Sequence, residues 1–186
     1  MKILVACEFS GVVRDEFLKL GHDAVSCDLL STEIPGPHIQ GDVLDIINSG
    51  EWDLLIAHPP CTHLSSSGAR WFSGKQKEQY QAISFFLEIA FCAIPRYCIE
   101  NPVGIISTHW RRPDQYIQPW EFGHGETKKT CLWLRNLPRL KSTNIVTGRT
   151  ARVHLEPPGV NRWKNRSRTY PGIALAMAEQ WGFLGK

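Results

Sequence analysis

The chain alternates short apolar runs with segments in which apolar residues recur at helical spacing. Lys2 to Phe9 is an apolar run that predicts a strand, and Val12 to Leu20 follows with helical periodicity that Gly21 ends. Ala24 to Cys27 and Leu54 to Ala57 predict further strands, and the second is apolar throughout, as in a strand covered on both faces. This succession of strands and helices is typical of an α/β domain with a mostly parallel sheet.

The same reading extends to the carboxyl end of the chain. Further elements are expected at Ile39 to Val43 (a strand edge), Lys75 to Ile94 (a long helix), Tyr97 to Val103 (a short strand), Lys128 to Leu134 (a strand) and Ile173 to Trp181 (a closing helix). Residues 105–125 and 138–168 show little periodicity and predict irregular structure. We therefore expect one domain over residues 1–186.

Composition narrows the class of protein. A chain of 186 residues with 42% hydrophobic content can bury a sizeable single core. There is no apolar run of 18 residues and no signal-peptide pattern, so we expect a cytoplasmic protein that does not enter a membrane. The six cysteines include no Cys-x-x-Cys pair, which indicates reduced thiols and predicts no metal site.

The charges are spread unevenly along the chain. Residues 1–60 carry three Lys or Arg against ten Asp or Glu, whereas residues 61–186 carry 18 against eight. Between Arg135 and Arg168 nine basic residues accompany a single acid, with Trp133, Trp163 and Tyr170 nearby, which favours nucleic-acid binding over a merely solvated basic face. The candidate contacts are Ser65, Arg70, Arg149, Arg152, Arg162, Lys164 and Arg166.

Cys61 occupies a position suited to chemistry. Pro59 and Pro60 end the apolar strand, so Cys61 lies at a strand's carboxyl end, the edge where open α/β sheets bind ligands. The thiol is a candidate nucleophile, and a buried structural cysteine is the alternative. Glu100 ends the next predicted strand and should lie beside Cys61 if the two strands are neighbours.

Two acids mark a second part of this edge. Asp28 and Asp42 each follow a short predicted strand, where a carboxylate can bind the ribose or adenine of a nucleoside. The turn at Ser10-Gly11 lacks the further glycines of a dinucleotide fingerprint, so a cofactor pyrophosphate is poorly supported.

These groups together fit alkylation of a pyrimidine at carbon 5. The thiolate of Cys61 would add to carbon 6, and a carboxylic acid would share a proton with ring N3 so that carbon 5 can attack a methyl donor. Glu100 must be partly protonated for that role, and we expect burial beside the sheet to raise its pKa.

The motifs resemble those of the DNA (cytosine-5) methyltransferases over about residues 1–134 and the final helix. Pro59-Pro60-Cys61 with Ser65 is similar to the catalytic Pro-Cys motif, and Glu100-Asn101-Pro102 to the Glu-Asn-Val motif. The cofactor motifs are resembled by Phe9-Ser10-Gly11, by Asp28 and by Gly41-Asp42-Val43.

The resemblance implies a fold, a cofactor and a partner. It implies the Rossmann-like sheet of S-adenosylmethionine-dependent methyltransferases, mostly parallel with an antiparallel last strand and helices on both faces. It implies S-adenosylmethionine bound by Phe9, Ser10, Gly11, Asp28, Asp42 and Pro59, and transfer to carbon 5 of cytosine in DNA through Cys61.

The chain departs from the family pattern in three places. Val12, Val13 and Arg14 stand where the first motif carries more glycine. The Gln-x-Arg-x-Arg motif is replaced by Glu126 to Thr130, in which Lys128 keeps one positive charge for the catalytic site and Thr130 keeps none. The large target-recognition domain has no counterpart beyond the short basic segment 135–168, which predicts poor sequence discrimination.

Arg168 aligns with an Asn that borders the cofactor in the family. A guanidinium there disfavours a sulfonium unless an anion lies between them, so a carboxylated donor bound by Arg168 is one hypothesis and a phosphate contact the other. Three alternatives to DNA C5 methylation stay open: the same chemistry on a free cytosine nucleotide, a non-catalytic nucleic-acid-binding relative, and methylation of an exocyclic amine. The last is disfavoured because His58 stands where those enzymes carry Asp or Asn before the two prolines.

Overall fold

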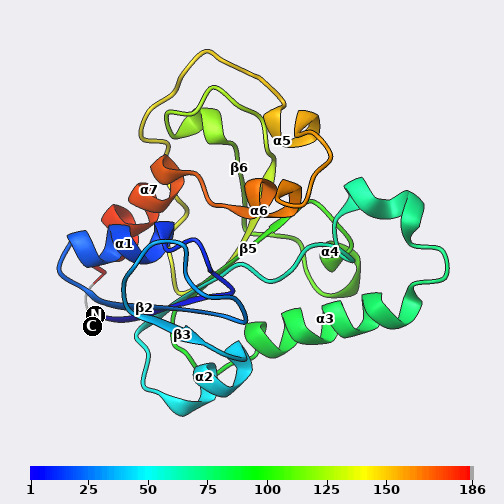
Figure 1. The fold of residues 1–186 in the computed structure, drawn as a ribbon. Helices are drawn as coiled ribbons and strands as arrows, with labels where there is room; N and C mark the ends of the chain where they lie inside the picture. Colours follow the sequence, from blue (N-terminus) through cyan, green and yellow to red (C-terminus); the bar gives the residue numbers. More distant parts are fainter. Residues whose placement is uncertain (185–186) are drawn as a thin grey trace.

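A seven-stranded sheet forms the centre of the protein, with strands in the order β3-β2-β1-β4-β5-β7-β6 (Figure 1). The computed structural model describes residues 1–184, apart from the side chains of Arg70 and Trp71. The strands are β1 (Lys2–Ala6), β2 (Asp23–Asp28), β3 (His38–Gln40), β4 (Leu54–Ala57), β5 (Tyr97–Pro102), β6 (Gln115–Ile117) and β7 (Thr130–Arg135). The helices are α1 (Val12–Lys19), α2 (Val43–Ser49), α3 (Gln76–Ala90), α4 (Ile106–His109), α5 (Arg152–Leu155), α6 (Arg162–Ser167) and α7 (Pro171–Trp181), with 3-10 turns η1 (Ser66–Trp71) and η2 (Pro119–Glu121).

The strand directions confirm the predicted fold class, a mostly parallel Rossmann-like sheet with helices on both faces. Strands β1 to β5 pair in parallel, with Ala6 opposite Ala57 and Ala57 opposite Ile99 at the carboxyl edge. Strand β7 is antiparallel to both β5 and β6. Strands β4 and β5 are neighbours, so the condition for placing Glu100 beside Cys61 is met, although Glu100 lies within β5 and not at its end.

The alternation of β1 distributes its side chains between two cores. Ile3 and Val5 join the core beneath α1 and α7, whereas Leu4 and Ala6 join the core beneath α2 and α3. Figure 1 shows these helix pairs on opposite sides of the sheet. Each large aliphatic side chain buried in this way contributes about 1.5–3 kcal/mol, so continuous apolar runs such as β4 are stable only in the centre of the sheet. Among residues 1–184, no helix combines the length and hydropathy needed to cross a bilayer.

Several element boundaries differ from the prediction. Val43 begins α2 instead of extending a strand, because the Asp42 side chain accepts a hydrogen bond from the Leu44 amide and caps the helix. Helix α3 ends at Ala90, before the expected Ile94, and the Arg135 guanidinium binds the Ala90 carbonyl group at 2.8 Å.

The two regions expected to be irregular contain regular structure. Residues 105–125 include α4, η2 and the edge strand β6, and residues 138–168 include α5 and α6. These elements have three to six residues each, too few for a period to be visible in the sequence. They form because they pack on the sheet or on one another.

Candidate active site

The turn that carries Cys61 is held by backbone hydrogen bonds. The Cys61 carbonyl group accepts a hydrogen bond from the Ser65 amide at 2.9 Å, which closes a tight turn directly after the prolines. The next residue, Ser66, donates its amide to the Val103 carbonyl at 3.0 Å, and Ser65 pairs with Gly104. The segment after β5 therefore sets the position of Cys61 relative to Glu100.

Asn101 strengthens the same connection from the side of β5. Its side-chain Nδ2 donates a hydrogen bond to the Pro59 carbonyl at 2.7 Å, and the residue is only 2% exposed. A buried amide that binds the loop before Cys61 limits the movement of that loop. Asn101 thus holds the backbone before Cys61, whereas Glu100 lines a cavity.

Glu100 is paired with His58, the residue that follows β4. The distance between His58 Nδ1 and Glu100 Oε2 is 2.9 Å, and both side chains are largely buried. Burial raises the pKa of Glu100, but the hydrogen bond from His58 and the charge of Lys128 outweigh it, so the pKa is lowered. The expectation of a raised Glu100 pKa is therefore wrong: burial acts in the expected direction, but the sequence did not reveal His58 as the partner that outweighs it.

The Cys61 thiol has the opposite balance. Burial raises its pKa and the negative charge of Glu100 raises it further, while Lys128 and Arg166 lower it without reversing the shift. Cys61 is therefore a protonated thiol at neutral pH in this structure. Because the two cations are already present and do not reverse the shift, the thiol becomes a thiolate only if its surroundings change, as on ligand binding.

One small cavity lies on the Glu100 side of this region and has a volume of about 10 Å³, room for about one water molecule. Glu100, Lys128 and Thr130 line it together with Tyr170 at the start of α7. The Lys128 ammonium donates to the Arg166 carbonyl at 3.1 Å, which ties the end of α6 to this cavity. Lys128 is thus brought to Glu100 as predicted, whereas the Thr130 hydroxyl donates to the backbone of Lys128 and offers no charge.

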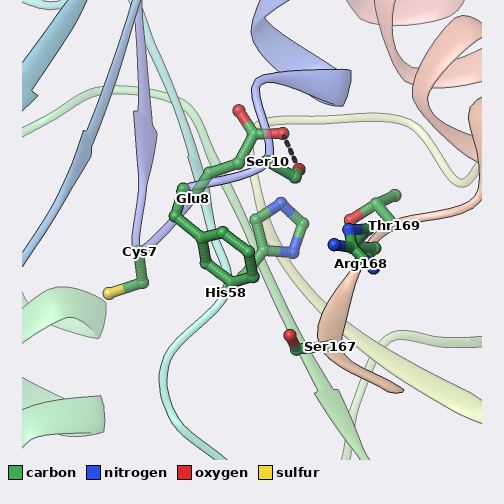
Figure 2. Close-up of a pocket in the computed structure, with 8 residues that line it drawn as sticks. Cys7, Glu8, Ser10, His58, Ser167, Arg168 and Thr169 are labelled. Carbon is green, nitrogen blue, oxygen red and sulfur yellow. Dashed lines mark hydrogen bonds between the residues drawn. The ribbon is translucent and has the colours of Figure 1, made fainter. Parts of the chain in front are cut away.

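A second cavity, the cofactor-side pocket, has a volume of about 40 Å³ and lies at the carboxyl end of β1 (Figure 2). Its walls are residues 7–10, His58 and residues 167–169. Three predicted cofactor residues, Phe9, Ser10 and Arg168, line it. The volume is far below that of a ligand pocket, so in this structure the pocket has room for only a small part of a cofactor.

Glu8 occupies the amino-terminal end of α1. Its carboxylate accepts hydrogen bonds from the amides of Val13 at 2.7 Å and Arg14 at 3.3 Å and from the Ser10 hydroxyl at 3.1 Å. Burial raises its pKa, although these bonds lower it in part. Since the side chain fills the position where a helix amino terminus would bind a phosphate, the site does not favour a dinucleotide.

Arg14, which follows the Phe9-Ser10-Gly11 turn, has a structural role. The side chain is fully buried, and its guanidinium donates to the Ser26 and Thr32 hydroxyls at 3.2 Å each and to the Ile34 carbonyl at 2.9 Å. Gly11, with φ of 77°, is required here because a Cβ would lie 2.6 Å from Arg14 Nη2. Arg14 thus fastens the loop after β2 to α1.

The two acids expected to bind the nucleoside lie along the edge beside the cofactor-side pocket and do not line it. Asp28 ends β2 and accepts the Leu30 amide at 2.9 Å, and Asp42 caps α2. Burial raises the pKa of Asp28 and of Cys7, and both Asp28 and Asp42 raise that of Cys7 further. Because Cys7 lines the pocket, Asp28 and Asp42 lie close to this wall of the pocket.

Arg168 lines the pocket, but its guanidinium already has an anionic partner. Its Nε and Nη2 donate to the two carboxylate oxygens of Glu33 at 2.8 Å each, and its Nη1 donates to Asn165 at 2.7 Å. The Glu33 amide donates to the Phe9 carbonyl at 2.8 Å, so the loop after β2 is held against two residues that line the pocket, Phe9 and Arg168. Glu33 therefore supplies an anion to Arg168 within the protein itself.

The candidate nucleic-acid contacts are largely engaged within the protein. Arg152 pairs with Glu126 at 2.8 Å, Arg162 donates to the Glu156 carbonyl at 2.8 Å, and Lys164 lies 4.0 Å from Glu33. The remaining ones are Arg149, which stacks on Trp120, Arg166, whose carbonyl binds Lys128, and Ser65, whose hydroxyl contacts Ser67. The Arg70 side chain lies outside the described part of the structure.

Only one of the three aromatic residues named with this segment is available for stacking. Trp163 is 51% exposed, with its ring 5.7 Å from that of Phe9. Trp133 and Tyr170 are buried, because Trp133 packs on Phe86 in the core and the Tyr170 hydroxyl donates to Glu126 at 2.6 Å. The expectation that basic and aromatic residues alternate on one surface is therefore wrong for these two.

Sequence reasoning assigned no role to four residues of the site: Glu8, Glu33, His58 and Asn101. His58 directly follows β4 and Glu8 comes two residues after the end of β1, and this position at strand ends was a usable signal. Glu33 lies in a loop without periodicity, and its partner is 135 residues away in the chain, so no local pattern indicates it.

Comparison with known proteins adds little to this geometry. No protein-family model matches the chain, and no curated protein matches its sequence. Among solved structures, the chain is similar to a candidate DNA modification methyltransferase encoded within a prophage (E. coli), at 14% identity and a TM-score of 0.47. The similarity covers 71% of this chain and 45% of that chain, so it spans less than half of the other protein.

Proposed function

We propose that the protein transfers a methyl group from S-adenosylmethionine to carbon 5 of cytosine in DNA through a covalent bond to Cys61. The observation that carries the proposal is that Cys61 follows β4 while Glu100 lies in the neighbouring parallel strand β5, close enough for its charge to raise the pKa of Cys61, at the same edge as the cofactor-side pocket. A thiol and a carboxyl group in this arrangement suit addition to a pyrimidine ring.

The residues of the cofactor-side pocket fit S-adenosylmethionine better than a phosphate cofactor. Glu8 blocks anion binding at the amino terminus of α1, and the buried Nε2 of His58 in the pocket has no partner among the described residues. Phe9, Ser10 and Gly11 would hold the methionine part, and Asp28 and Asp42 the adenosine part along the adjoining edge. Bound there, the cofactor supplies the methyl group that carbon 5 accepts.

Cys61 and Glu100 divide the work on the ring. Cys61 forms a bond from its sulfur to carbon 6 as its thiol proton passes to ring N3 by way of the Glu100 carboxylate. Lys128 and Arg166 stabilise the thiolate form of Cys61. After carbon 5 has been alkylated, its proton is lost to solvent, the carbon 5 to carbon 6 double bond returns, and the bond to Cys61 breaks. The Glu100 carboxylate then takes the proton from N3 and returns it to the Cys61 thiolate.

The substrate is proposed to be DNA, contacted by the basic segment 135–168 instead of by a separate recognition domain. Residues 152–167 of this segment place α5 and α6 beside the two cavities, with Lys164 and Trp163 next to Phe9. Internal pairing of several arginines favours weak contact with little sequence discrimination.

A transfer assay tests the proposed function. Labelled S-adenosylmethionine is supplied with double-stranded DNA, single-stranded DNA, RNA or dCMP, and the modified base is identified by mass. We expect 5-methylcytosine in DNA. Transfer to dCMP alone would replace DNA by a free nucleotide as the substrate. Transfer to none of the four, with DNA binding retained, would indicate a non-catalytic nucleic-acid-binding protein.

A further inference from the structure

His58 lies between the two cavities of the site. Its ring lines the cofactor-side pocket, and its Nδ1 is 2.9 Å from the carboxylate of Glu100, which lines the other cavity. Figure 2 shows the imidazole among the side chains of the pocket, between Ser10 and Arg168. The side chain is 9% exposed, so it has little contact with solvent.

The two ring nitrogens of His58 have different environments. Glu100 is a carboxylate because its pKa is lowered, so Nδ1 must carry the proton and donate it to Glu100. In the neutral imidazole, Nε2 then presents a lone pair and accepts hydrogen bonds. This Nε2 is buried and has no partner among residues 1–184.

Neighbouring donors in the pocket are already engaged. The Ser10 hydroxyl donates to Glu8 at 3.1 Å, and the Arg168 guanidinium donates to Glu33 and Asn165. A buried acceptor without a partner costs free energy, which a ligand with an N–H group would recover on binding. Since Glu33 offsets the charge of Arg168, a cationic N–H group suits this position.

We propose that His58 couples donor binding to the position of Glu100, an assignment that rests on the proposed function. Its Nε2 accepts a hydrogen bond from the ammonium group of the methyl donor, and its Nδ1 holds the Glu100 carboxylate toward the target cavity. His58 is thus a donor-binding residue on one side and a positioning residue on the other.

Two substitutions separate the two roles. In His58→Asn the amide nitrogen takes the place of Nδ1 and can still donate to Glu100, but nothing reaches the donor. In His58→Gln the longer side chain reaches the place of Nε2, but the bond to Glu100 is lost. His154→Asn in α5, where the side chain is exposed, is the matched control.

Donor affinity is measured by calorimetry with S-adenosylmethionine, and adduct formation by gel shift with duplex DNA that contains 5-fluorocytosine at saturating donor. For His58→Asn we expect donor affinity to fall about tenfold and adduct formation to stay within about threefold of wild type. For His58→Gln we expect adduct formation to fall about tenfold and donor affinity to stay within about threefold of wild type. In a double-mutant cycle, Glu100→Ala should weaken donor binding in wild type and leave it unchanged in His58→Asn.

Wild-type donor affinity in His58→Asn would overturn the coupling. So would equal losses of both properties in the two variants, because such losses indicate only a role in folding. A wild-type protein that binds no S-adenosylmethionine would instead refute the proposed function. Wild-type transfer that is insensitive to both substitutions would refute the role of His58 alone.

Discussion

The guanidinium of Arg168 forms two parallel hydrogen bonds with the carboxylate of Glu33, which lies 135 residues earlier in the chain. The pair joins the segment before α7 to the loop after β2, across the cofactor-side pocket. Its hydrogen bond lowers the pKa of Glu33, so the pair stabilises the fold above the ordinary pKa of a glutamate. That stabilisation is lost as the pH falls through the lowered pKa.

This pair predicts that the protein uses ordinary S-adenosylmethionine. Arg168→Asn and Glu33→Gln should each weaken donor binding, and each should lower the free energy of unfolding by about 0.2–1 kcal/mol, since the pair is partly exposed. Competition between S-adenosylmethionine and a carboxylated analogue, read by the mass added to cytosine, should show the same preference in wild type and Arg168→Asn. A loss of preference for the carboxylated analogue in that variant would restore the carboxylated-donor hypothesis.

Cys61→Ser is expected to abolish transfer while donor affinity stays at the wild-type value, because Cys61 does not line the cofactor-side pocket. The measurement pairs a transfer assay with calorimetry. Cys92→Ser is the control, since this thiol lies at the end of α3, remote from the site in sequence and buried in the core. Near wild-type turnover by Cys61→Ser would show that the reaction does not pass through a covalent adduct.

The rate of adduct formation should rise with pH. The pKa of Cys61 is raised by burial and by Glu100, so the thiolate fraction is small at neutral pH and grows about tenfold per pH unit below that pKa. Arg166→Gln removes a charge that lowers this pKa, so it should slow adduct formation by the same factor at pH 7 and pH 8, because both values lie below the pKa. An unchanged rate in Arg166→Gln at saturating DNA would assign Arg166 to DNA binding only.

Glu100→Gln should reduce turnover by about a hundredfold or more, as for loss of a general acid or base. It should also change stability in a pH-dependent way. Because the folded-state pKa of Glu100 is lowered, its contribution is complete above the unfolded value and disappears as pH falls through the folded value. Glu100→Gln should therefore destabilise the protein at pH 7 more than in acid, as urea titrations at several pH values would show. Equal destabilisation throughout would mean that the pKa is not lowered.

DNA affinity should depend steeply on salt and little on sequence. Each phosphate contact that is removed should lower the slope of log affinity against log salt by about one. Arg149→Gln, at an exposed side chain, tests this, and Arg152→Gln is the comparison because Arg152 pairs with Glu126. We expect the slope to change in Arg149→Gln, and mainly the stability to change in Arg152→Gln. Salt-independent binding, or a strong preference for one short site, would contradict the assignment.

The sequence by itself determined the sheet and the edge at which the site lies. Continuous apolar runs such as Leu54 to Ala57 are stable only when both faces are covered, and prolines at 59 and 60 end that strand wherever it pairs. These are local properties of the backbone and of burial. That Cys61 and Glu100 lie near each other depended also on the order of the strands, which the sheet supplies.

The tertiary structure alone decided which charges meet. Glu33 meets Arg168, His58 meets Glu100, and Arg14 is buried beneath the loop after β2, because folding brings together segments that no period or motif relates. The sign of the Glu100 pKa shift is a difference between burial and two nearby partners, so it could not be predicted from burial alone. Folding also brings Arg152 and Arg168 into ion pairs with glutamates, although the composition of the basic segment indicated free cations.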